Sequence, residues 1–199
     1  MIIVTKDRAE QQPPSTMIPL SAGEGLQPAL SKLAGLTGVP EAALQQEFSG
    51  EPGVLHTLYH REGRLHLIGL GKSPDFESVL KAFRSFAHKC RGQLHTQSAL
   101  SLLHGGYNCS PATLVEAAVN GLLLGTYQAG RYKKDQVPEL HPMRASGAQL
   151  EILVPEEHRN LCHTLAERGR SVAMTQLSII ELVNAPSNKK APAVLAEWA

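Results

Sequence analysis

The sequence predicts an α/β fold in which a mixed sheet is flanked by helices on both faces. Apolar and β-branched runs typical of strands alternate along the chain with segments whose apolar residues recur at helical spacing. Residues 54–60 and 64–70 are strand-like runs on either side of the loop Arg61-Glu62-Gly63, a pattern typical of an antiparallel hairpin. One hairpin among alternating strands and helices indicates a mixed sheet.

The first part of the chain contains two predicted strands and two predicted helices. Residues 2–5 are a β-branched run, and residues 17–20 form a second, shorter strand. Leucines at helical spacing predict a helix over residues 25–36, and Pro40 suits the first turn of another helix that reaches Phe48. The hairpin follows this second helix.

Capping residues mark the helices after the hairpin. At residues 73–75, the tripeptide SPD predicts a helix start with the serine as N-cap and the proline in the first turn, and the apolar pattern continues to Phe86. Residues 110–111 repeat this arrangement ahead of a helix that reaches Tyr127. Between these helices, residues 94–96 are expected to form a strand.

The last part of the chain is expected to contain a loop, a strand and a long helix. Residues 131–147 have mixed charge and two prolines, which indicates a loop, and residues 149–154 alternate as a strand does. The long helix is expected to start at residues 155–157. It should end near Asn184, because the next residue precedes a proline and is pushed out of the helical region. A further helix is expected to begin at Pro192.

Charge and cysteine content exclude several classes of protein. The 19 basic and 18 acidic side chains leave a net charge of +1, which provides no field to attract nucleic acid or an anionic membrane. Cys90, Cys109 and Cys162 are widely spaced and suit a reducing compartment better than a disulfide framework. No apolar run reaches the ~20 residues of a membrane span, and charged residues follow Met1 too soon for a signal peptide. A cytoplasmic protein is therefore expected.

Three stretches of the chain match one known family in order and spacing. They are LIGLGK at residues 67–72, GLLLGTY at 121–127 with RYK at 131–133, and ELVNAPSN at 181–188. Through them the chain resembles the leucyl (cytosol) aminopeptidases, and the last stretch resembles the junction between the N-terminal and catalytic domains of that family. The sequence departs from the family pattern at Ile180, where a basic residue is usual, and at Ala191, where a polar residue is usual.

The resemblance implies a domain organisation. Residues 1–154 would form an N-terminal domain similar to macro domains, a three-layer α/β sandwich. Residues 155–185 would be a helix that links it to the catalytic domain, and residues 186–199 would be the start of a truncated catalytic domain. The resemblance further implies a role for the N-terminal domain in oligomer assembly and in access to the active site, with a hexamer as the family's assembly.

The resemblance also implies the chemistry of the parent protein. Leucyl aminopeptidases are cytoplasmic exopeptidases that remove N-terminal amino acids from peptides with two divalent metal ions, manganese or zinc. Two-metal hydrolysis needs clustered carboxylates, and the family's NTDAEGR motif is absent from these 199 residues. The sequence therefore assigns no catalytic, cofactor-binding or metal-binding residue, and the chain alone is expected to be inactive.

Two glycine-containing loops raise an alternative function. Residues 71–73, GKS, precede a helix, but a Walker A loop requires glycine where His66 stands, and a dinucleotide fingerprint requires glycine where Pro74 stands. Residues 104–110, HGGYNCS, also precede a helix start and are the better candidate for a ligand loop. The alternative is thus a stand-alone macro-like module that binds ADP-ribose or a related nucleotide.

The remaining candidates for metal binding or catalysis are histidines and one cysteine. His56, His60 and His66 could approach one another on the hairpin, but no carboxylate beside them would support a metal. His158 and His163 are five residues apart, which does not place them on one helix face. The hairpin histidines are interpreted as surface or half-buried residues, and Cys109, which has no predictable base partner, as a small packed residue.

Binding to DNA is a third possibility, because some members of the resembling family show it. The basic residues that could contribute are interpreted as solvated, and they are Arg131, Lys133, Lys134, Lys189 and Lys190. The near-neutral net charge argues against this function.

Overall fold

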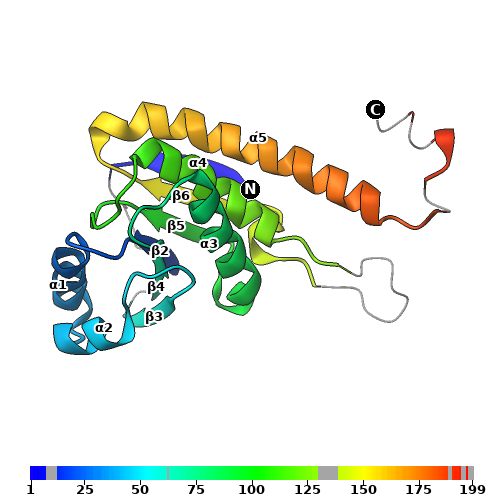
Figure 1. Cartoon of the computed structure of the whole chain (residues 1–199). Coiled ribbons are helices and arrows are strands. Elements are labelled where there is room, and N and C mark those ends of the chain that lie inside the picture. Colours follow the sequence, from blue (N-terminus) through cyan, green and yellow to red (C-terminus); the bar gives the residue numbers. More distant parts are fainter. Residues whose placement is uncertain (8–12, 62, 130–138, 188–189, 194–195, 197–199) are drawn as a thin grey trace.

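The computed structural model describes residues 1–199 except 8–12, 62, 130–138, 188–189, 194–195 and 197–199 (Figure 1). The described residues form a six-stranded sheet with the order β1-β6-β5-β2-β4-β3. The strands are β1 (Ile2–Lys6), β2 (Ser15–Leu20), β3 (Leu55–His60), β4 (Gly63–Gly69), β5 (Gln97–Ser101) and β6 (Gln149–Leu153). Strands β3 and β4 pair antiparallel and the other neighbours pair parallel, which confirms the mixed sheet and its hairpin.

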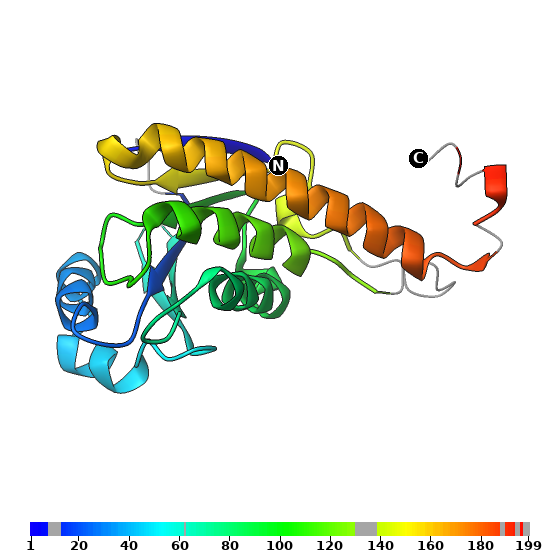
Figure 2. The same cartoon turned by 45° about the horizontal axis from the view of Figure 1, so that its top comes forward.

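Helices lie on both faces of this sheet, as predicted. One face carries α1 (Leu26–Thr37) and α2 (Glu41–Glu47). The other face carries α3 (Phe76–Lys89), α4 (Pro111–Gly125) and α5 (Arg159–Asn184), which lie side by side in Figure 2. Three short 3-10 helices complete the described elements: η1 (Arg91–Gln93), η2 (Pro142–Arg144) and η3 (Glu156–His158).

The larger core lies between the sheet and the α3–α4–α5 layer. Helix α4 is its centre, because α4 is apolar on nearly all sides and lies between α3 and α5. A Cβ atom on Gly121 of α4 would overlap the carbonyl oxygen of Leu80 in α3, and one on Gly169 of α5 would meet the carbonyl oxygen of Glu116 at 2.5 Å. These two glycines let the three helices approach at backbone distance, which fixes the position of α5 on the domain.

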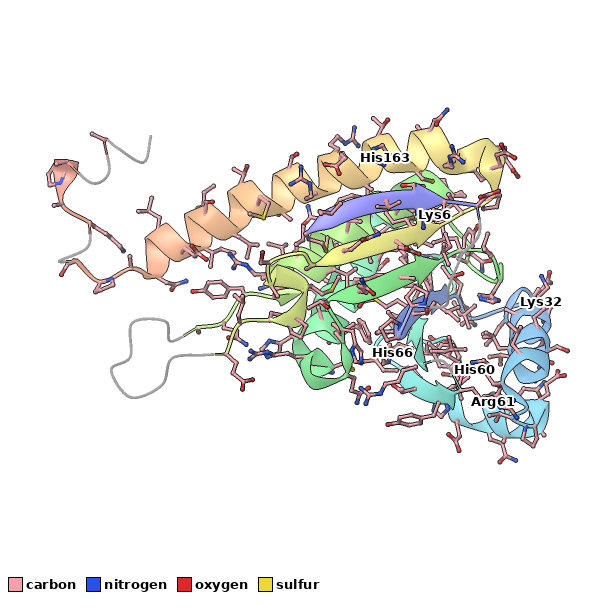
Figure 3. The ribbon with its side chains drawn as sticks, turned by 180° about the vertical axis from the view of Figure 1, so that it is seen from behind. Lys6, Lys32, His60, Arg61, His66 and His163 are labelled. Atoms are coloured by element: carbon pink, nitrogen blue, oxygen red, sulfur yellow. The ribbon has the colours of Figure 1, made fainter. Side chains whose placement is uncertain are left out.

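The smaller core lies under α1 and α2. It joins these helices to the β2–β4–β3 half of the sheet through Ile18, Leu33, Phe48 and Leu67, all of which are buried. The view from behind shows that no helix of the described residues lies over β1, β6 and β5 on this face (Figure 3). On that uncovered half, Lys6 of β1 and Glu151 of β6 form an ion pair of 3.2 Å.

Two of the sequence predictions about local structure were wrong. The strand expected at residues 94–96 is instead the connection after η1, and β5 begins at Gln97. This strand was missed because its sequence QSALS is small and polar, and parallel neighbours on both sides determine its conformation. The N-cap of α3 is Asp75 rather than Ser73, because Asp75 and Ser78 form a reciprocal capping box.

Other local predictions were confirmed within a few residues. Ser110 caps α4 by accepting a hydrogen bond from the backbone N–H of Thr113. The long helix α5 starts at Arg159, after η3, and ends at Asn184 as expected, since Ala185 has an extended backbone. Residues 131–138 of the predicted loop and most of the helix predicted from Pro192 lie outside the described residues, and the described rest of the loop contains the short helix η2.

Candidate functional site

The carboxyl edge of the parallel strands is the first place where the fold could hold a ligand. Strands β2 and β5 are neighbours, and the helices that follow them, α1 and α4, lie on opposite faces of the sheet. In open α/β sheets such a reversal leaves a crevice outside the strand ends, where ligands commonly bind. Both candidate ligand loops of the sequence, residues 71–73 and 104–110, are at this edge.

Hydrogen bonds among the loops close this edge. The carbonyl oxygen of Gly106 accepts a hydrogen bond from the backbone N–H of Ser21 at 2.6 Å. The backbone N–H of Asn108 donates to Ser21 Oγ at 3.0 Å, and its side-chain amide donates to the carbonyl oxygen of Lys72 at 3.0 Å. The loops after β2, β4 and β5 are therefore tied to one another through Asn108.

The glycines of these loops serve close packing. Gly106 has a left-handed backbone, φ 76°, and a Cβ atom there would lie 2.9 Å from Ala29 Cβ and 3.0 Å from the carbonyl oxygen of Gly25. The backbone N–H of Gly71 is occupied as well, because it donates to the carbonyl oxygen of Gly50 at 2.8 Å. The loop over residues 104–110 thus fills the position at which a ligand would enter, and a nucleotide-binding module is not favoured.

His66 is the centre of a buried polar network. It is 1% exposed, and its two ring nitrogens lie 3.1 Å from Ser15 Oγ and 3.0 Å from Thr57 Oγ1, while its ring contacts Phe86. Burial, with the nearby positive charge of Arg64, lowers the pKa of His66 to about 4. The ring is neutral at pH 7, and the fully buried Ser15 beside it is closed to any substrate.

The three hairpin histidines do not converge. His56 Nδ1 lies 3.2 Å from a carboxylate oxygen of Glu47 in α2, on the opposite face of the sheet from His66. His60 shares the face of His56 because the two are four residues apart in β3 (Figure 3 labels His60 and His66). Among the residues the structure describes, no group of three or more His, Cys, Asp or Glu side chains could hold a metal ion.

The cysteines of the described chain are free thiols. Burial raises the pKa of the Cys109 thiol to about 11, so the thiol is protonated at neutral pH. A protonated, half-buried thiol is a poor nucleophile, which agrees with its interpretation as a packed residue. Of the basic residues weighed for DNA binding, Lys190 alone lies in the described part of the chain, and its ammonium donates to the carbonyl oxygen of Val183 at 2.6 Å.

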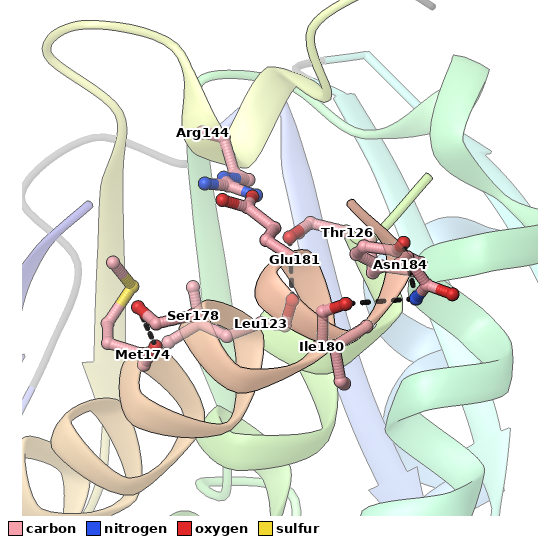
Figure 4. A network of polar contacts seen from close by, with 9 residues as sticks. Leu123, Thr126, Arg144, Met174, Ser178, Ile180, Glu181 and Asn184 are labelled. Carbon is pink, nitrogen blue, oxygen red and sulfur yellow. Dashed lines mark hydrogen bonds and ion pairs between the residues drawn. The ribbon is translucent and has the colours of Figure 1, made fainter. Parts of the chain in front are cut away.

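Two of the three stretches that carry the family resemblance meet at the end of α5. The side-chain amide of Asn184, from ELVNAPSN, donates to the hydroxyl of Tyr127, from GLLLGTY, at 2.9 Å and to the carbonyl oxygen of Ile180 at 2.9 Å (Figure 4). One turn earlier, Glu181 pairs with Arg144 of η2 at 3.4 Å. These contacts hold the last turn of α5 in a fixed direction on the domain, and we call this group the α5 junction.

Sequence reasoning singled out Tyr127, Glu181 and Asn184 of the α5 junction, but it found neither Arg144 nor the contacts. Asn184 and Tyr127 are 57 positions apart, and no local signal pairs them.

The Ser15–His66–Thr57 network was missed for the same reason, since it joins three different strands. Alternation along β4 places His66 on the same face as Ile68, but β4 is buried on both faces, so the sequence alone did not mark His66 as the centre of a network.

The comparisons with known proteins point to one family. The family model for the N-terminal domain of the cytosol aminopeptidase family matches residues 17–136. A probable cytosol aminopeptidase of Chloroherpeton thalassium is 29% identical over 177 residues, which are 80% of this chain and 35% of that protein. Leucine aminopeptidase 1 of Arabidopsis thaliana is 29% identical over 186 residues, which are 86% of this chain and 33% of that protein.

Solved structures show the same relationship. A mutant of tomato leucine aminopeptidase superposes with a TM-score of 0.76 at 26% identity and covers 99% of this chain and 41% of that one. The bottromycin maturation enzyme BotP shares the fold, with a TM-score of 0.65 at 16% identity, over 93% of this chain and 35% of that one. The chain therefore spans about a third of the length of the curated relatives that it matches. Within the described residues, no helix is long and apolar enough to cross a membrane.

Proposed function

Because the chain belongs to the cytosol aminopeptidase family, whose N-terminal domain it carries, we propose that it is the non-catalytic N-terminal domain of a metal-dependent leucyl aminopeptidase. The parent enzyme would remove N-terminal amino acids from peptides in the cytoplasm. The match of the family model over residues 17–136 is the observation that carries this proposal.

The donor chemistry of the described residues supports a non-catalytic role. Two-metal hydrolysis needs carboxylates that hold both ions and orient a bridging water. No group of three or more potential ligands lies together in the described part of the chain, so these residues do not fit a metal pair. Manganese or zinc would instead be held by the catalytic part of the longer polypeptide.

The proposed role of the domain is to contribute to oligomer assembly and to access around the active sites. We assign residues 1–154 to the domain proper, 155–185 to the linking helix and 186–199 to the start of the catalytic domain. The α5 junction supports this division, because it fixes the direction in which the chain leaves the domain. A hexamer is the assembly that we expect for the parent.

Activity of the chain alone and of a fusion tests this function. The chain would be assayed on leucine amide with manganese or zinc, and no turnover is expected. The fusion joins residues 1–187 to the catalytic part of the Chloroherpeton thalassium relative, and it should be active and oligomeric. Turnover by the chain alone would contradict the proposal. An inactive fusion would also contradict the proposal, provided that the unmodified relative, with its own N-terminal domain, is active in the same assay.

A further inference from the structure

The two halves of α5 differ in charge. The first half, residues 159–170, carries four charged side chains, among them Arg168, whose guanidinium forms a bidentate ion pair with Glu116. From Ser171 to Asn184 the sequence contains a single charged residue, Glu181, and this residue pairs with Arg144. A helix surface that faces water normally carries charged side chains. The second half of α5 lacks them.

Apolar side chains are exposed on this second half. Val172 is 43% exposed, Ile179 is 45% exposed and Val183 is 67% exposed, while Met174 on the other flank of the helix is 42% exposed. Single exposed apolar residues are ordinary on protein surfaces. Val172, Ile179 and Val183 are seven and four residues apart, so these three lie on one side of the helix.

The hydroxyl groups between these apolar residues are turned toward the helix. Thr175 Oγ1 donates to the carbonyl oxygen of Ser171 at 3.1 Å, and Ser178 Oγ donates to that of Met174 at 3.0 Å (Figure 4 shows the latter). Ser171 Oγ donates to the carbonyl oxygen of Glu167 at 2.9 Å. These bonds satisfy the hydroxyl donors within the helix, so burial of the surface by a partner would leave none of them unpaired.

Together these residues form a neutral surface that we call the outer face of α5. Its exposed members are Ser171, Val172, Met174, Thr175, Ile179 and Val183. Apart from the Lys190 ammonium at the carbonyl oxygen of Val183, a charged partner would find no opposite charge among these residues and would lose hydration without compensation. The face therefore fits an apolar, uncharged protein surface. We propose that the outer face of α5 is the surface on which the catalytic domain of the same polypeptide docks, an inference that rests on the proposed function.

The size of the outer face favours a tethered partner over a separate one. The helix rises about 18 Å from Ser171 to Val183 at ~1.5 Å per residue, and a helix is ~10 Å wide, so the face covers roughly 200 Å². A stable interface between separate proteins buries about 800 Å² on each partner. A domain joined by a short linker needs far less, because the tether gives an effective concentration in the millimolar range.

The position of the outer face also favours a domain that follows it in the chain. The helix ends at Asn184, one residue after Val183, and the α5 junction fixes this end on the domain. Figure 1 shows the second half of α5 extending past the sheet, with the chain turning away directly after it. A domain connected there starts next to the outer face.

Methionine oxidation provides a direct test with a native probe. Met174 is exposed, whereas Met17 and Met143 are buried and serve as internal references. The chain alone and the active fusion described above would be treated with hydrogen peroxide, and the oxidation rate of each methionine would be measured by mass spectrometry. We expect Met174 to oxidise at least about tenfold more slowly in the fusion. An equal rate in the active fusion would overturn the inference.

Substitutions on α5 sharpen the test. In the fusion, Val172→Asp together with Ile179→Asp should restore fast oxidation of Met174, because two charges on the outer face oppose docking. Leu161→Asp is the matched control, since Leu161 is 55% exposed on the charged half of the same helix, and it should leave Met174 protected. Val172→Ser with Ile179→Ser is a milder pair whose folding in the chain alone can be verified by thermal unfolding. Continued protection in both double variants would overturn the inference.

The outcomes separate this inference from the proposed function. An inactive fusion counts against the proposed function, and an active fusion with unprotected Met174 counts against the docking surface alone. The oxidation rate of Met174 in the chain alone would also be measured at several protein concentrations. A rate that falls as the concentration rises would show that a second copy occupies the face, and this would also overturn the inference.

Discussion

The carboxyl edge of the sheet and the outer face of α5 are two regions where this domain could meet another molecule, and they use their polar groups differently. At the edge, Gly106 and Asn108 bond to Ser21, and Asn108 also bonds to Lys72, so three loops are brought into contact. On α5, the hydroxyls of Thr175 and Ser178 bond within their own helix and leave apolar groups outward. In many α/β proteins ligands bind at the first kind of region and charges cover the second. In this domain the edge is closed and the helix surface is uncharged, which indicates that the domain interacts through the helix surface.

The largest effect is expected from opening the closed edge at Gly106. Gly106→Ala adds a Cβ atom next to Ala29 and the backbone of Gly25, on top of the strain of a left-handed alanine. We expect a loss of about 4 kcal/mol in the free energy of unfolding, as measured by urea denaturation. Gly105→Ala is the control, because Gly105 has nearly the same φ with nothing within 4 Å, and it should cost about 1 kcal/mol. Equal losses would show that the edge is not tightly closed.

The next effect concerns the buried network around His66, which belongs to the closed part of the molecule. Its pKa is about 4 in the folded chain and 6.5 for an unperturbed histidine. Between these pH values the unfolded chain binds a proton that the folded chain does not, so stability is complete above pH ~6.5 and falls as the pH drops toward 4. We expect a loss of about 3 kcal/mol over this interval from His66.

Unfolding at a series of pH values would measure this loss. His66→Gln keeps a polar side chain between Ser15 and Thr57 but cannot titrate, so its stability should depend less on pH than that of the unmodified chain. Equal pH dependence in both proteins would assign the effect to other groups, since burial also lowers the pKa of His104 and His141.

A smaller effect is expected at Asn108, which joins the loops of the edge. Asn108→Ala removes the side-chain hydrogen bonds to the carbonyl oxygens of Lys72, at 3.0 Å, and Ala22, at 3.5 Å, and keeps the backbone bond to Ser21. We expect a loss of about 1 kcal/mol, because the bond that is lost to Lys72 lies near the surface and the one to Ala22 is long. Hydrogen exchange should accelerate at the backbone N–H of Ser21, whose bond to Gly106 depends on the loop staying in place. Unchanged exchange there would contradict the tie between the loops.

The elements that sequence reasoning predicted are those with local signals. The hairpin, the Ser110 cap and the end of α5 depend on residues close in the chain. Strand β5 was missed because its small residues take their conformation from β2 and β6. The missed cap at Asp75 is an exception, because its partner Ser78 is only three residues away and the signal was local. The same distinction holds for the candidate site. Sequence reasoning found the short stretches that match the family, but it did not find the contacts that these stretches make with distant parts of the fold.

Contacts between distant residues explain what the family-like stretches do. Tyr127 and Asn184 bond to each other, and the backbone N–H of Gly71 binds Gly50 while its carbonyl oxygen accepts from Ala22. In each case the matched residues stabilise the arrangement of elements. A glycine-lysine pair before a helix suggested chemistry from the sequence alone, but in the structure its backbone joins loops.

The smallest effect is expected on the outer face of α5, and this result would sharpen the contrast with the edge. Val172→Ser and Ile179→Ser remove apolar groups that are already largely in water, so each should change the free energy of unfolding of the chain alone by no more than about 0.5 kcal/mol. Leu177→Ala is the control on the buried side of the same helix and should cost about 3 kcal/mol. A large loss from either serine variant would show that the outer face already packs against this chain. A small loss, together with loss of Met174 protection in the fusion, would identify residues that stabilise docking without stabilising the domain itself.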